Sequence, residues 1–159
     1  MNALVVVYSR TGRTRRVGQE IAAALGAELE VIADRRSRRG LFGFLRSGYE
    51  ALRAKTPAIT PPQHDPRDYE LVVIGTPIWA GRMASPIRTY LMRFRGTFRR
   101  AAFFCTSQGG GHRDALAEMS RLAGVEPVAT LEISARQIQR GEERKAIQDF
   151  LARLREGSG

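Results

Sequence analysis

The stretch that decides the fold runs from residue 3 to residue 14 and reads Ala3-Leu4-Val5-Val6-Val7-Tyr8-Ser9-Arg10-Thr11-Gly12-Arg13-Thr14. Its first half is an uninterrupted run of apolar, mostly β-branched residues, which is typical of a parallel strand covered on both faces. Its second half contains hydroxyls and a glycine, and a helical pattern follows it. The stretch therefore predicts a buried strand, a loop and a helix, the opening unit of an α/β domain.

Strand and helix patterns alternate along the rest of the chain. We expect strands over residues 3–8, 28–33, 71–75, 101–105 and 128–133. Between them, apolar residues recur at helical spacing at Val17, Ile21 and Leu25, at Leu41, Leu45, Tyr49 and Leu52, at Ile87, Leu91 and Phe94, at Leu116, Met119 and Leu122 or Ala123, and at Ile147, Phe150, Leu151 and Leu154. A charged turn is expected over 34–39 and a proline-rich connector over 57–68. The alternation predicts an α/β fold with a doubly wound, five-stranded parallel sheet and helices on both faces.

Length and composition indicate one domain. The chain has 159 residues, and we assign residues 1–156 to a single domain and 157–159 to a flexible tail. We see no leader pattern, and the longest apolar runs fall short of the ~18 residues of a membrane span, so we expect a soluble, cytoplasmic protein. The single cysteine, Cys105, excludes an internal disulfide framework and is expected to be a small buried residue.

The chain is strongly basic. Its formal net charge is +10, and all but two of its 26 basic residues, Lys55 and Lys145, are arginines. This charge fits a solvated arginine-rich surface, and it also fits attraction to an acidic protein, an anionic lipid surface or nucleic acid, the last being the least favoured. Charge alone does not choose among these interpretations.

Three loops that follow expected strands should meet at one edge of the sheet. They cover residues 9–14, 76–81 and 106–111. Loops that leave the carboxyl ends of parallel strands converge on one crevice, so these segments predict one ligand site. In the first loop, hydroxyls and a helix N-terminus favour a phosphate, although a plain strand-to-helix turn with Thr14 as N-cap would use the same residues.

The second loop carries Trp79, the only tryptophan of the chain. A large aromatic residue on a loop at a strand end is a natural surface for stacking a planar ring. The third loop has three glycines and no bulky side chain, so its main chain can lie against a flat polar heterocycle, or it can serve as a flexible turn before a helix that starts near His112.

These motifs resemble those of the flavodoxin-like family, whose short members bind FMN. Residues 8–14 are similar to the family's phosphate loop, S/T-x-T-G-x-T, and residues 69–81 to its third strand and the loop that contacts the isoalloxazine ring. The resemblance implies the strand order 2-1-3-4-5 and FMN as cofactor. The cofactor-binding residues that it implies are Ser9, Arg10, Thr11, Gly12, Arg13 and Thr14 at the phosphate, Pro77, Ile78, Trp79, Ala80 and Gly81 at the ring, and Ser107, Gln108, Gly109 and Gly110 at its pyrimidine side.

The sequence departs from that family in two respects. Arginine stands at position 13, where many members have asparagine, and the third loop lacks a second aromatic residue, so we expect the ring to stack on one side only, with room for a substrate over the open face. Arg10, Arg13 and Arg82 would stabilise the anionic reduced flavin and make its potential less negative than in acidic carriers. Because the flavin performs the redox chemistry, no catalytic side chain is expected.

The resemblance implies electron transfer, or FMN-dependent reduction of a small acceptor such as a quinone, with an acidic redox protein or a small molecule as partner. The alternative is a flavodoxin-fold binding module without flavin that docks an acidic protein or nucleic acid through its basic surface, for example through the arginines at 35, 36, 38 and 39 and the apolar residues that follow them.

Other chemistries lack their motifs. The G-x-x-x-x-G-K-[ST] pattern of a Walker loop is missing, and Cys105 is followed six positions later by Gly111 rather than by the arginine of a cysteine phosphatase loop. His64 and His112 are far apart in the sequence, so we expect no metal cluster, and His112 is interpreted as a surface cap of its helix.

Overall fold

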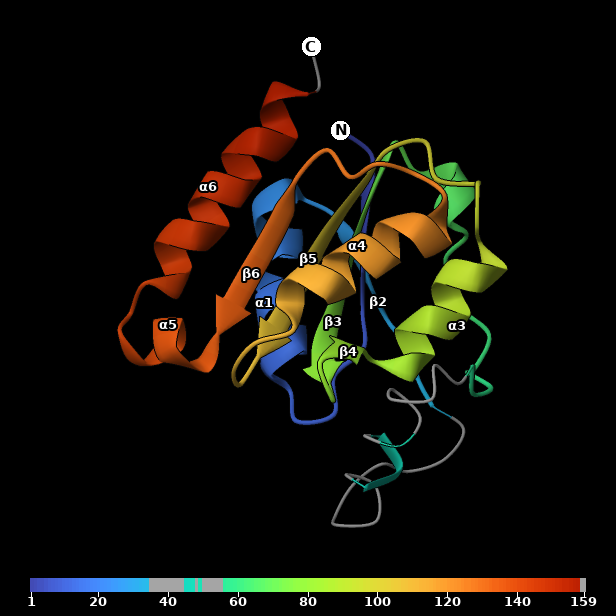
Figure 1. The fold of residues 1–159 in the computed structure, drawn as a ribbon. Helices are drawn as coiled ribbons and strands as arrows, with labels where there is room; N and C mark the ends of the chain where they lie inside the picture. The colour runs from blue at the N-terminus through green and yellow to red at the C-terminus, as the bar shows by residue number, and fades with distance from the viewer. Residues whose placement is uncertain (35–44, 48, 50–55, 158–159) are drawn as a thin grey trace.

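The computed structural model describes residues 1–34, 45–47, 49 and 56–157 (Figure 1). Its central sheet contains five parallel strands: β1 (Ala3–Val7), β2 (Glu28–Val31), β3 (Leu71–Trp79), β5 (Ala101–Ser107) and β6 (Thr130–Ser134). Their order, β2-β1-β3-β5-β6, is the predicted 2-1-3-4-5. A two-residue strand, β4 (Arg82–Met83), pairs antiparallel with the end of β3 and was not predicted.

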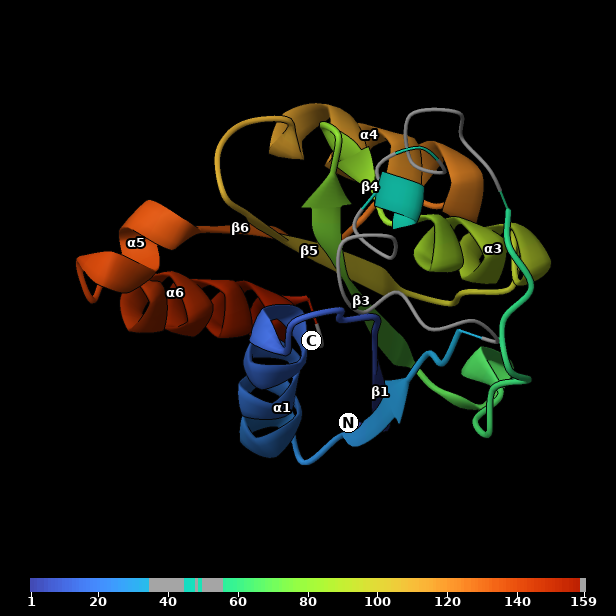
Figure 2. The same ribbon diagram turned by 90° about the horizontal axis from the view of Figure 1, so that it is seen from below.

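Helices cover both faces of the sheet. The helices α1 (Arg13–Leu25) and α6 (Glu143–Glu156) lie on one face, and α3 (Ser85–Arg93) and α4 (His112–Ala123) on the other (Figure 2). Successive residues of β1 point to opposite faces, so Val5 and Val7 pack toward α1 and α6, while Leu4 and Val6 pack toward α3 and α4. The doubly wound prediction is therefore confirmed.

The helical patterns of the sequence mark the buried faces. Val17 and Ile21 of α1 are buried, as are the four apolar residues of the last helix. The α1 helix ends at Gly26, which adopts a left-handed conformation as its C-cap, as the sequence predicts. Cys105 is fully buried in β5, and burial, together with the charge of Glu132, raises the pKa of its thiol to about 12.

Two short helices were not predicted. The 3₁₀ turn η1 (Pro66–Asp68) lies inside the connector, and α5 (Ala135–Gln139) follows β6. A capping box begins α5, in which Ser134 accepts a hydrogen bond from the backbone N–H of Gln137, and the Gln137 side chain accepts one from the backbone N–H of Ser134. This S-x-x-Q signal is visible in the sequence and could have revealed the helix.

Most of the segment between β2 and the connector lies outside the described residues. This holds for residues 35–39 of the predicted charged turn, for most of the predicted helix over 41–52, and for the tail beyond Gly157. Within the described residues, no helix combines the length and the apolar character needed to cross a membrane.

Candidate functional site

The three predicted loops meet at the carboxyl edge of the sheet, the lower edge in Figure 1, and enclose a cavity of about 470 Å³. This volume is typical of a small-molecule site, for which ~300–1,000 Å³ is usual. The lining residues are Ser9, Arg10, Thr11, Arg13, Thr14, Ser47, Pro77, Ile78, Trp79, Ala80, Thr106, Ser107 and Gln108. Eleven of the fifteen predicted site residues thus line one cavity, and their role in binding remains a prediction.

The start of α1 forms a positively charged end of the cavity. Gly12, with φ 99°, is the N-cap, and no side chain caps the helix there; Thr14, considered as a cap from the sequence, is the second helical residue. The first turn contains arginines at 13, 15 and 16 and no acidic residue; of these, Arg13 lines the cavity, and Arg16 pairs with Glu143 of α6. Like charge at the positive end of a helix disfavours the isolated helix and favours an anion.

Hydroxyl groups shape this end of the cavity. The Ser9 Oγ accepts a hydrogen bond of 2.8 Å from the backbone N–H of Gly12, which closes the loop before the helix. The buried hydroxyls of Thr14 and Thr106 lie 2.8 Å apart and share one hydrogen bond. Whichever hydroxyl donates, the other keeps its own proton for a further acceptor, and both residues line the cavity. The Thr14–Thr106 pair thus joins α1 to β5 and retains a spare donor.

Three apolar residues at the end of β3, Pro77, Ile78 and Trp79, form a wall of the cavity, and their secondary structure differs from the prediction. Residues 76–79 continue β3 instead of forming a loop, because Pro77 still pairs with Thr106 of β5, and Ile78 and Trp79 pair with β4. Trp79 is only 8% exposed, and its ring meets that of Tyr8 edge to face, at 5.4 Å between centroids and 86° between planes. The indole is therefore a fixed part of the wall formed by Pro77, Ile78 and Trp79.

The tip of this hairpin is a two-residue turn. Ala80 and Gly81 have φ of 49° and 75°, the positive values that a tight hairpin turn requires. Alanine adopts such a positive φ only with backbone strain, so Ala80 is strained in this turn. It also lines the cavity. Thr76 has a structural role: its buried hydroxyl accepts from the backbone N–H of Ala84 and donates to the carbonyl of Pro77, both at 2.9 Å.

The third loop contacts the hairpin tip. A Cβ atom on Gly111 would lie 2.7 Å from the Cα of Gly81, so the two backbones pack directly on each other. Ser107 donates to the carbonyl of Gly109 at 2.8 Å and so holds the loop closed. Four predicted site residues, Gly12, Gly81, Gly109 and Gly110, do not line the cavity.

Two lining residues were missed. Thr106 belongs to the predicted third loop, 106–111, but was not among the predicted binding residues, and its position at the end of β5 was a usable signal. Ser47 lies within the segment predicted as a helix, and no pattern in the sequence associates it with the site.

Some of the charged side chains at this edge of the sheet line the cavity, and others form ion pairs outside it. Arg10 and Arg13 line it, as predicted. Arg82 does not, because its guanidinium pairs with Glu118 at 3.0 Å. His112 is the first residue of α4, as expected, but it is not the cap of the helix: the N-cap is Gly111, and no side chain caps the helix there. The Nε2 of His112 lies 3.0 Å from Glu132.

The fold and the site together define a doubly wound α/β protein with a ligand cavity at the carboxyl edge of its sheet. No family model and no curated protein matches the sequence. Among solved structures, the chain is similar to a flavoprotein in complex with FMN from Lactobacillus acidophilus NCFM, at 23% identity and a TM-score of 0.73, over 87% of this chain and 97% of that one.

The chain is also similar to oxidised Flavodoxin 1 from Bacillus cereus, at 16% identity and a TM-score of 0.59, over 100% of both chains. An NADH:FMN oxidoreductase in its apo form aligns at 14% identity and a TM-score of 0.58, over 98% of this chain and 88% of that one. At these identities the likeness establishes the flavodoxin-like fold, in agreement with the resemblance noted in the sequence.

Proposed function

We propose that this chain binds FMN at the carboxyl edge of its sheet and acts as a redox protein, in electron transfer or in the reduction of a small acceptor such as a quinone. The observation that carries the proposal is that one cavity is lined both by hydroxyl and arginine side chains from the start of α1 and by apolar side chains from the end of β3. This combination suits a ligand with a phosphate ester and a flat ring. The FMN complex of the similar Lactobacillus flavoprotein supports the choice.

The start of α1 would hold the phosphate. The free N–H groups of its first turn and the side chains of Thr11, Arg13 and Thr14 offer hydrogen bonds and positive charge to an anion. The Thr14–Thr106 pair adds a buried donor whose position is set by two elements of the fold.

The ring would lie along the wall formed by Pro77, Ile78 and Trp79. Trp79 is held by Tyr8, so the wall exists before any ligand binds, which reduces the entropy cost of binding. Ser107 and Gln108 also line the cavity and are small or polar, and no second aromatic side chain lines it among the described residues. This lining supports the proposal that one face of the ring is open to a substrate.

Flavin, when bound, supplies the electron and hydride chemistry, so the chain contributes binding, orientation and charge. Arg10 and Arg13 line the cavity and would favour the more negative, reduced state of the cofactor. Arg82 contributes less than the sequence suggested, because Glu118 balances its charge. We therefore expect a potential less negative than that of an acidic carrier.

The net charge of +10 favours an acidic redox protein as partner, or else a small-molecule acceptor. With a protein partner, the exchange rate should fall as salt screens the attraction. A reductase should instead oxidise NADH with a quinone and no second protein, at a rate that depends little on salt.

A titration of the purified chain with FMN, followed by absorbance, tests the proposal. We expect saturable binding, and about threefold to tenfold weaker binding for Thr106→Val, which removes one buried hydroxyl from the polar end. The matched control is Thr97→Val, the same substitution at a hydroxyl that donates to the carbonyl of Phe94, outside the cavity. If the chain takes up no FMN, the proposal is wrong and the flavin-free binding module replaces it.

A further inference from the structure

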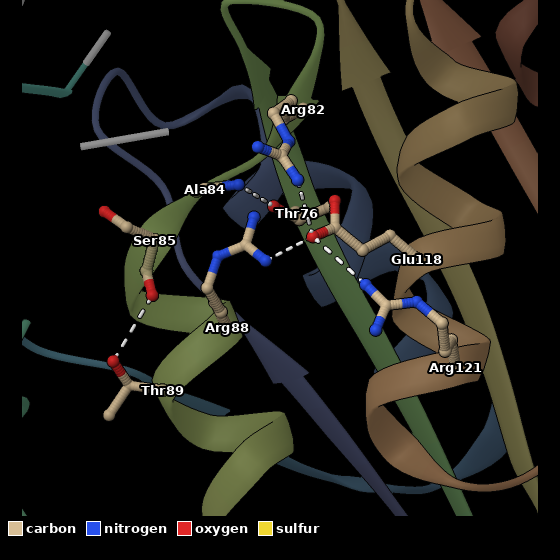
Figure 3. Close-up of polar contacts among 8 residues, drawn as sticks. All are labelled: Thr76, Arg82, Ala84, Ser85, Arg88, Thr89, Glu118 and Arg121. Atoms are coloured by element: carbon tan, nitrogen blue, oxygen red, sulfur yellow. Dashed lines mark hydrogen bonds and ion pairs between the residues drawn. The ribbon is translucent and has the colours of Figure 1, made fainter. Parts of the chain in front are cut away.

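A cluster of ion pairs lies beside the cavity without lining it. Figure 3 shows the guanidinium groups of Arg82, Arg88 and Arg121 converging on one carboxylate oxygen of Glu118. The Arg82 Nη2 lies 3.0 Å from this oxygen, the Arg121 Nη2 lies 3.7 Å from it, and Arg88 contacts it through Nη1. These four residues, here called the Glu118 cluster, come from β4, α3 and α4.

The centre of the Glu118 cluster is buried, whereas at its edge Arg82 is partly exposed and Arg121 is exposed, and the cluster carries excess positive charge. The side chains of Arg88 and Glu118 are only 4% and 10% exposed. The Nε and Nη2 of Arg88 are buried and have no hydrogen-bond partner among the described residues. A buried arginine is tolerated only where a carboxylate compensates it, so Glu118 is the group on which the cluster depends.

Arg82 connects this cluster to the cavity wall. It stands directly opposite Trp79 in the β3–β4 pairing, and Ala80 and Gly81 form the turn between them. The hairpin therefore touches α4 at two places, at Glu118 through Arg82 and at Gly111 through Gly81.

The hairpin needs such an anchor. Its second strand has two residues, of which only Met83 is buried in the core, and its turn contains the strained Ala80, so backbone pairing and Met83 hold the tip of the hairpin only weakly. Without the charge of Glu118, Arg82 and Arg88 would be left as two neighbouring like charges, one on the hairpin and one on α3. Their repulsion would push the hairpin away from the helices.

We infer that Glu118 is a positioning residue for the cavity wall, which holds the β3–β4 hairpin against α3 and α4 so that Trp79 and Ala80 keep their places. The inference concerns the wall that the proposed function uses, but it does not require the ligand to be FMN.

Trp79 reports on the hairpin directly, because it is the only tryptophan of the chain. We would measure acrylamide quenching of its fluorescence in the flavin-free chain. Glu118→Gln keeps the shape of the side chain and removes its charge, and we expect it to raise the quenching constant at least twofold. Glu118→Asp keeps the charge and should stay closer to the natural chain.

Glu143→Gln is the matched control. It removes the carboxylate that accepts two hydrogen bonds from Arg16, at 3.0 and 2.9 Å, in an ion pair between α6 and α1 that does not involve the hairpin. Quenching in this variant should equal that of the natural chain. Arg82→Met, which removes only the hairpin's side of the ion pair, should raise quenching even if Glu118→Gln does not fold.

Unchanged quenching in both Glu118→Gln and Arg82→Met would overturn the inference. So would an equal rise in Glu143→Gln, because it would indicate general loosening of the fold. Titration with FMN is a separate arm, in which Glu118→Gln should bind about threefold to tenfold more weakly. Changed quenching in a chain that binds no FMN would leave the inference standing and refute the proposed function.

Discussion

Substitution of Gly111 by alanine tests the contact between the third loop and the hairpin tip. Gly111 has φ 92°, and a Cβ atom there would lie 2.7 Å from the Cα and 2.9 Å from the carbonyl oxygen of Gly81. Gly124, at the other end of α4, has φ 70°, and its Cβ would meet Arg95 at an ordinary 3.6 Å. Alanine would therefore be strained by the left-handed backbone at either position, but it would clash with a neighbouring backbone only at position 111.

This difference sets the expected loss in the free energy of unfolding for each variant. A left-handed backbone costs an alanine about 1–2 kcal/mol, so Gly124→Ala should lower the free energy of unfolding by that amount. In Gly111→Ala, the hairpin must also move until the distance from the new Cβ atom to the Cα of Gly81 grows from 2.7 Å to at least 3.4 Å, a shift of about 0.7 Å. Overpacking of this kind adds about 1–3 kcal/mol, for a total of about 2–5 kcal/mol.

The assay is urea unfolding of the flavin-free chain, together with quenching of Trp79 and a titration with FMN. Gly111→Ala should lose more stability than Gly124→Ala, raise the quenching constant and weaken FMN binding about tenfold, whereas Gly124→Ala should change only stability. Equal losses of stability in the two variants, with Trp79 quenching unchanged, would refute the proposed contact between the loops.

Three further results are expected. Ala80→Gly should raise the free energy of unfolding by about 0.5–1 kcal/mol in urea, because glycine adopts the φ of 49° without strain; a loss of stability would mean that the alanine methyl is needed there. Cys105, whose pKa burial raises to about 12, should react with iodoacetamide at pH 8 about a hundred times more slowly in the folded chain than in urea, and equal rates would contradict its burial. Although burial alone would raise the pKa of Glu118, its ion pairs with Arg88 and Arg82 together lower it, so the stability they contribute is complete above the ordinary value of 4.5 and is lost as the pH falls below it. Unfolding measured from pH 7 to pH 3 should accordingly show less acid sensitivity in Glu118→Gln than in the natural chain.

The order of the elements could be predicted because it depends on local periodicity. The run at residues 3–8 has the apolar, β-branched character of a strand buried on both faces, and Val17 and Ile21 recur at the spacing of one helix face. The convergence of the three loops followed from the geometry of parallel strands, without any knowledge of their distances.

The end of β3 could not be predicted in this way. Pro77 and Gly81 are turn signals in a sequence, yet β3 continues to Trp79, because β5 on one side and β4 at its end supply partners for the backbone. Trp79 thus became part of the packed wall rather than an exposed loop residue.

The sequence by itself determined the fold class and the set of loops that surround the cavity, because these depend on which residues are apolar and at what spacing. The strand order came from the resemblance to the flavodoxin-like family, not from those patterns. Only the tertiary structure decided three contacts: Thr14 hydrogen-bonds with Thr106, Gly111 packs on Gly81, and Arg82 pairs with Glu118 instead of lining the cavity. Each of these contacts joins residues at least 30 positions apart, and their distances and burial follow from how the helices pack on the sheet.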